Sequence, residues 1–257
     1  MSAGEAVVGI VIGFVSGVLS GLFGVGGGIV MTPGIQVLMG STPIVALATP
    51  LPVIFPTALT GAATYRRAGE VDTHAALWMA GPGIAGAVVG AWFTKLIDTH
   101  LLLVVTALLL AYQSVSILRG ARQSAAAPVP RKATPLMFAG IGLLAGLISG
   151  LLGIGGGLIM VPMLAGVLGM PLKRALGTSL LAIVALVIPG TIVHTALHHI
   201  DWAIFLVVTI GAVPGARVGA RLALGTRERT LRLLVGSFLL VVALAYGLSE
   251  ATALIRG

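Results

Sequence analysis

The chain contains no cysteine among its 257 residues, which excludes disulfide bonds and thiolate metal sites. Charge is also scarce, because Asp, Glu, Lys and Arg make up only 9% of the residues, against about 25% in a typical soluble domain. The hydrophobic share is 58% and the mean hydropathy is +1.12. A chain with so little charge is typical of an integral membrane protein that lies mostly within the bilayer.

Carboxylates are missing from the predicted membrane interior. All of the acidic residues fall at the ends of predicted spans or in loops: Glu5, Glu70, Asp72, Asp98, Asp201, Glu228 and Glu250. Proton relays and cation sites usually place carboxylates at depth, so neither is indicated. The sequence also shows no nucleophile–base pair, and its glycine runs lack the lysine of a nucleotide-binding loop. We therefore expect neither an enzyme nor a bound cofactor.

The weak alternation of a transmembrane β-barrel is absent as well. Uncharged runs such as 101–118 and 233–248 are long enough, or nearly so, to span the hydrocarbon core as helices. The net charge of +8 comes from basic residues in short loops between spans. That placement indicates a role in membrane topology and disfavours nucleic acid as a partner. We predict an all-α, polytopic membrane protein.

Glycine is abundant, and one glycine-rich segment occurs twice. Ser20–Gly28 reads SGLFGVGGG and Ser149–Gly157 reads SGLLGIGGG. Further residues match at the same offset along the chain, Asp72 with Asp201 among them. These matches predict a duplication. The first repeat covers 1–120, a cytoplasmic linker covers 121–134, and the second repeat covers 135–257.

Each repeat shows the same order of segments. An apolar segment enters the glycine break, a short one leaves it, and three full spans follow. The predicted ranges are 5–20, 29–40, 44–65, 73–96 and 100–118 in the first repeat, and 135–149, 158–169, 174–197, 202–224 and 230–248 in the second.

The distribution of basic residues indicates how the chain passes the glycine breaks. If each break is one continuous crossing, the loop charges divide evenly between the two sides. If each break is a hairpin that turns back, the basic residues in loops and at span ends divide twelve to two. Lys95 and Arg256 then lie opposite Arg66, Arg67, Arg119, Arg122, Arg131, Lys132, Lys173, Arg174, Arg221, Arg227, Arg229 and Arg232. The hairpin arrangement obeys the positive-inside rule. It predicts repeats of inverted topology, with both termini outside.

The glycine breaks are the first candidate for a binding site. Irregular backbone is tolerated at membrane depth only against protein or a water-filled cavity, and a helix that starts there presents free N–H groups and a positive dipole end. Two such ends could meet at one anion site, which would be formed by Gly24, Gly26, Gly27, Gly28, Gly153, Gly155, Gly156 and Gly157. The alternative is that glycine only permits close helix packing, as we expect for Gly86, Gly90, Gly215 and Gly219.

Polar side chains near the breaks could take part. The hydroxyls of Thr49, Thr178 and Ser179 could donate to an anion, or could bond back to the preceding helical turn. Arg217, the one basic residue well inside a span, could act as an electrostatic helper, or could extend to the cytoplasmic surface.

Three histidines, His194, His198 and His199, lie near the outer end of their span. We interpret them as an interfacial polar cluster and expect no metal site.

The duplicated GxGGG segment followed by proline, at Gly24–Pro33 and Gly153–Pro162, together with Gly177-Thr178-Ser179, resembles the sulfite exporter TauE/SafE family over essentially the whole chain. The resemblance implies an inner-membrane permease for small sulfur-containing anions such as sulfite, thiosulfate or organosulfonates. The first repeat departs from the Gly-Thr-Ser pattern, since it reads Ala48-Thr49-Pro50.

The sequence thus predicts a multi-pass secondary transporter of a small anion, working by alternating access. A passive anion channel of the same architecture and a membrane scaffold that transports nothing are the alternatives. Small-residue faces such as 81–91 could pack within the chain or form a homodimer.

Overall fold

The computed structural model describes residues 3–93, 133–152 and 156–256, with 108, 111–112, 114–115 and 117–119 between them. Every regular element in these residues is a helix, which confirms the predicted all-α class. Most of the predicted linker (121–132) and most of the predicted span at 100–118 lie outside the described residues.

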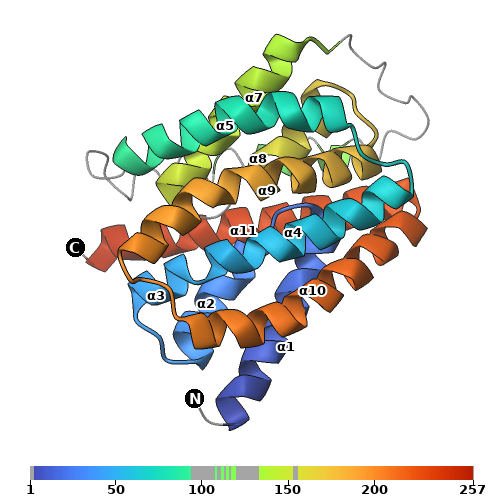
Figure 1. Cartoon of the computed structure of the whole chain (residues 1–257). Helices are drawn as coiled ribbons and strands as arrows, with labels where there is room; N and C mark the ends of the chain where they lie inside the picture. Colours follow the sequence, from blue (N-terminus) through green and yellow to red (C-terminus); the bar gives the residue numbers. More distant parts are fainter. Residues whose placement is uncertain are drawn as a thin grey trace.

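The described helices follow the predicted order in both repeats (Figure 1). The first repeat contains α1 (Ala3–Phe23), α2 (Gly28–Leu38), α3 (Pro43–Ala48), α4 (Pro50–Arg67) and α5 (Thr73–Phe93). The second contains α7 (Pro135–Leu152), α8 (Gly157–Pro162), the π-helical turn η1 (Met163–Val167), α9 (Leu172–Ala196), α10 (Trp202–Gly225) and α11 (Glu228–Arg256).

A proline lies at each of the two places where a predicted segment is divided. The span predicted at 44–65 is divided into α3 and α4 where Thr49 meets Pro50, because proline has no N–H to continue the helical ladder. The segment after the second glycine break changes from α8 to η1 after Pro162.

By length and apolar composition, four helical stretches in the described part can cross a membrane: Ala3–Phe23, Ile44–Arg67, Leu172–Ala196 and Trp202–Gly225. The segments that leave the breaks, Gly28–Leu38 and Gly157–Val167, are apolar but shorter. At about 1.5 Å per residue, such a segment reaches only about halfway across the hydrocarbon core.

The first glycine break turns the chain back on itself, as predicted. A methyl group on Gly34 of α2 would lie 2.9 Å from the side chain of Ile12, and one on Gly9 would lie 3.3 Å from Met39. These contacts pair the start of α1 with the end of α2. The two helices therefore run antiparallel and form a hairpin.

Helices α1 and α10 pack backbone to backbone. A methyl group on Gly17 would lie 2.2 Å from the carbonyl oxygen of Ala212, so no larger residue fits there without a shift. The same approach to a partner carbonyl recurs at every fourth position, at Gly13, Gly17 and Gly21 of α1 and at Gly211, Gly215 and Gly219 of α10. The paired positions advance together along both helices, so α1 and α10 are parallel.

Helices α5 and α7 repeat this arrangement. Methyl groups on Gly90 and Gly146 would lie 2.1 Å and 2.0 Å from the carbonyl oxygens of Leu147 and Gly83. Since α7 is the equivalent of α1 and α5 of α10, each repeat's first helix packs against the other repeat. The packing role predicted for Gly86, Gly90, Gly215 and Gly219 is confirmed. The small-residue face at 81–91 was also a candidate for a homodimer contact, and its residues Gly83, Gly86 and Gly90 pack within the chain.

Helices α4 and α9 lie side by side across the middle of the molecule, between the α5–α7 pair and the α1–α10 pair (Figure 1). Gly61 contacts Leu180 and Gly190 contacts Leu51. Gly61 is equivalent to Gly190 and Leu51 to Leu180, so the two contacts are equivalent. The later residue of α4 meets the earlier residue of α9, so the two helices are antiparallel. Their apolar side chains form much of the core.

We expect Gly17→Ala to lower the stability of the protein in detergent. The added methyl group meets the backbone carbonyl of Ala212, and overpacking of this kind costs about 1–3 kcal/mol. Gly140→Ala in α7 is the matched control, because no atom lies within 4 Å of its added methyl group. Thermal unfolding should show a lower midpoint for Gly17→Ala alone, and equal midpoints for both variants would contradict this packing.

Candidate functional site

The two glycine breaks meet at the buried centre of the molecule. A methyl group on Gly157 would lie 2.4 Å from the carbonyl oxygen of Gly24 and 2.7 Å from Cα of Val25. Gly24, Gly26 and Gly27 have φ of 71°, 83° and 84°, a left-handed conformation that residues with a side chain rarely adopt. The first break therefore requires glycine because its turn has positive φ angles. The second break requires glycine at 157 because any side chain there would collide with the backbone of the first break.

Apolar side chains surround this meeting point. Ile54 and Ile183, which occupy equivalent positions in the two repeats, are fully buried. A methyl group on Gly26 would lie 3.2 Å from Ile54 and 3.5 Å from Ile183. Backbone groups and hydroxyls supply the polarity here.

Two short helices begin at the breaks. At the start of α2, the N–H groups of Val30 and Met31 donate to the carbonyl of Gly27, and no side chain caps the helix. The N–H groups of Gly28 and Ile29 come before the first N–H that bonds within the helix, so they have no acceptor in α2. α8 starts in the same way, with Ile159 and Met160 donating to Gly156. Both amino ends are suited to a negative charge. Gly153 and Gly155 lie outside the described residues.

Three carbonyl groups at the end of α1 and in the first break have hydrogen-bond partners. Gly24 N–H donates to the carbonyl of Ser20 at 2.8 Å. The buried hydroxyl of Tyr65 donates to Gly21 O at 2.9 Å, and that of Ser179 lies 3.0 Å from Gly24 O and 2.9 Å from Leu176 O. Ser179 thus ties α9 to the first break, a role that its place in the sequence did not reveal.

Thr49 and Thr178 join the two repeats. The Asp72 N–H donates to Thr178 Oγ1 at 2.9 Å, and the Asp201 N–H donates to Thr49 Oγ1 at 3.2 Å. The two bonds are equivalent with the repeats exchanged. This contact between the repeats is a role that the sequence analysis did not predict. The sequence carried one signal for this contact: both the threonine and the aspartate recur at the offset that separates the two repeats.

Among the residues that the structure describes, an ion pair reinforces only one of these contacts. Arg174 lies 3.0 Å from the carboxylate of Asp72, and the ammonium group of Lys173 donates to the carbonyl of Leu224 at 2.6 Å. The position equivalent to Arg174 is Val45. Asp201 instead accepts bonds from the first N–H groups of α10, as an N-cap residue does.

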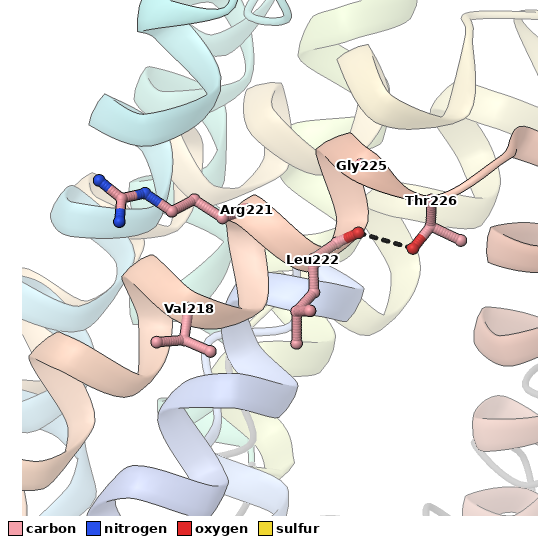
Figure 2. A pocket seen from close by; sticks show the side chains of 5 residues that line it. All are labelled: Val218, Arg221, Leu222, Gly225 and Thr226. Carbon is pink, nitrogen blue, oxygen red and sulfur yellow. Dashed lines mark hydrogen bonds between the residues drawn. The ribbon is translucent and has the colours of Figure 1, made fainter.

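Arg217 is exposed on α10, whereas the described break glycines are buried, so this conformation does not bring Arg217 to them. One turn further on, Arg221 borders a shallow pocket with Val218, Leu222, Gly225 and Thr226. Figure 2 shows the Arg221 side chain extending away from Leu222 and Thr226, and the Thr226 hydroxyl donating to the carbonyl of Leu222. This pocket is formed by the end of α10 alone.

The histidines at the end of α9 form a pair. Nδ1 of His194 lies 3.2 Å from Nδ1 of His199, while His198 is exposed and has a φ of 56°. Within the described part of the chain, no group of three His, Asp or Glu residues could hold a metal ion.

Substitution of the two threonines tests the contact between the repeats. Thr178→Val and Thr49→Val should each destabilise the protein by about 1 kcal/mol or more, because a backbone N–H loses its acceptor while the side-chain shape is kept. Thr191→Val is the matched control, since its hydroxyl donates only to Val187 in its own helix. Denaturation midpoints measure the difference, and a control that loses as much stability as the other two would count against the contact.

Comparison with known proteins identifies the family. The family model described as "Sulfite exporter TauE/SafE" matches residues 9–246. YunE of Bacillus subtilis (strain 168), named a probable membrane transporter protein, is 27% identical over 91% of this chain and 94% of its own. A probable membrane transporter protein of Xylella fastidiosa (strain 9a5c) is 31% identical over 79% of each chain. No solved structure matches. The chain therefore belongs to the sulfite exporter TauE/SafE family of membrane transporters.

Proposed function

We propose that the protein is a secondary transporter that moves small sulfur-containing anions, of the sulfite, thiosulfate or organosulfonate class, across the inner membrane. The observation that carries the proposal is the meeting of the two glycine breaks at the buried centre, where Gly157 touches Gly24. Two helix amino ends at one buried point can hold an anion without a fixed positive charge. The family supports the class of substrate.

The site in this proposal is formed by Gly24, Gly26–Gly28, Gly153 and Gly155–Gly157, with nearby hydroxyls. Ser179 already lies at the first break, whereas Thr49 and Thr178 would reach the anion only if their bonds to the other repeat opened. Arg217 acts as an electrostatic helper and is not a direct ligand in this conformation.

The proposal includes an inverted topology of the two repeats. Antiparallel packing of the equivalent helices α4 and α9 supports it, as does the parallel packing of α1 with α10 and of α5 with α7. The bonds from Arg174 to Asp72 and from Lys173 to Leu224 gather three loops at one end of the molecule. This agrees with the side that the basic residues share in the hairpin arrangement.

Alternating access then has a simple physical form. The Thr178–Asp72 bond and its ion pair hold the repeats together at one end, and the Thr49–Asp201 bond holds them at the other. Opening one contact while the other stays closed would expose the centre to one side of the membrane at a time.

Counterflow in proteoliposomes tests the transport proposal. Saturable exchange of labelled sulfite or thiosulfate is expected for the wild type, with exchange at least about ten-fold lower in Gly157→Ala, because the added methyl group meets the first break. Gly140→Ala should exchange at the wild-type rate. Flux that does not saturate would identify a passive channel, and the absence of both flux and ligand stabilisation would identify a scaffold.

Single cysteines test the inverted topology cleanly, because the chain has none of its own. In intact cells, an impermeant maleimide should label Leu197→Cys in the loop after α9. It should label Arg67→Cys and Arg227→Cys only after the membrane is permeabilised. All three positions are exposed, so accessibility reports the side of the membrane, and labelling of Arg67→Cys and Arg227→Cys from opposite sides would rule out this topology.

A further inference from the structure

Two serines of α1 are fully buried with their hydroxyls unpaired. Ser16 and Ser20 have no exposed surface, and neither Oγ has a hydrogen-bond partner. Buried hydroxyls in membrane helices usually donate to a carbonyl of the preceding turn. Buried Thr57 and partly buried Thr191 do so here, at 2.6 Å and 2.8 Å. A buried hydroxyl without a partner costs free energy, so this pair requires an explanation.

The two serines lie against the amino end of α2. A methyl group on Gly27, the residue before α2, would lie 3.0 Å from the carbonyl oxygen of Ser16 and 3.3 Å from Cβ of Ser20. α2 has 11 residues and no side-chain cap. The backbone carbonyl of Ser16, Cβ of Ser20 and the N–H groups of Gly28 and Ile29 thus lie around one helix start.

The second repeat does not reproduce this arrangement. Ala145 stands at the position equivalent to Ser16, and Ser149 at that of Ser20, where it is only partly buried. Gly156 has a helical φ of −64°, whereas its equivalent Gly27 has a left-handed φ of 84°. The pair of unpaired hydroxyls therefore belongs to the first break alone.

We propose that Ser16 and Ser20, with the N–H groups of Gly28 and Ile29, bind the oxygen atoms of the transported anion. This deepens the proposed function and rests on it, and it makes the site asymmetric, centred on the first repeat. All four donors are neutral, so the site does not titrate. Several directed donors favour an anion with several oxygen atoms, such as sulfite, over chloride.

The hydroxyls are covered in this conformation. The anion therefore enters only when the start of α2 moves away from α1. Glycine at 26 and 27 lets the chain bend there without steric cost.

Alanine variants of the serines separate binding from packing. Ser16→Ala and Ser20→Ala in the full chain should unfold, without anion, at or above the wild-type temperature, since each removes an unpaired hydroxyl. The sulfite dissociation constant, measured by thermal shift at matched ionic strength with sulfate and chloride alongside, should rise about ten-fold or more in both. Ser149→Ala is the matched control and should bind sulfite as the wild type does.

The outcomes distinguish this proposal from the transport proposal. If the wild type exchanges sulfite and both serine variants bind it unchanged, the serine site is wrong and the transporter stands. A lower unfolding temperature with unchanged affinity would show that the serines only pack. If the wild type neither exchanges any of the anions nor is stabilised by one, both proposals are overturned.

Discussion

The fold depends on glycine rows that bring helices of different repeats into backbone contact. Between α1 and α10, and again between α5 and α7, successive turns place glycine residues against partner carbonyls. In lipid, dispersion at short range is the main attraction between apolar helices, so this closeness stabilises the assembly. Because each row joins one repeat to the other, neither repeat has its native neighbours when isolated. The centre, where the breaks meet, forms only when the two repeats pack together.

Interrupting a helix in a membrane creates backbone polar groups that need partners. The structure supplies them from distant segments. Tyr65 of α4 and Ser179 of α9 donate to carbonyls at the end of α1 and at the first break. The amino ends of α2 and α8 remain uncapped by side chains. Two carbonyls at the end of α1 and in the first break are thus paired, while the amino end of α2 has no side-chain cap, and on that difference we base the proposal of an anion site.

The repeats share a framework but differ in detail. The threonine–aspartate bonds and the contacts of Gly61 and Gly190 are equivalent when the repeats are exchanged. The ion pair of Arg174, the bond of Ser179 to Gly24 and the buried serines of α1 have no such equivalent. Equal packing with unequal polar groups allows two related conformations to differ in energy and in affinity for a ligand.

Local patterns in the sequence determined the membrane class, the two repeats, the hairpin at the first break and most helix bounds to within a few residues. Hydropathy and glycine influence the chain over one or two helical turns, so their effects can be predicted without knowing which helices pack together. The sequence could not show that Thr49 and Thr178 bind the other repeat, that Arg217 is exposed, or that Ser16 and Ser20 are left unpaired. Each depends on which helix faces meet across long stretches of chain, and only the tertiary structure decides that.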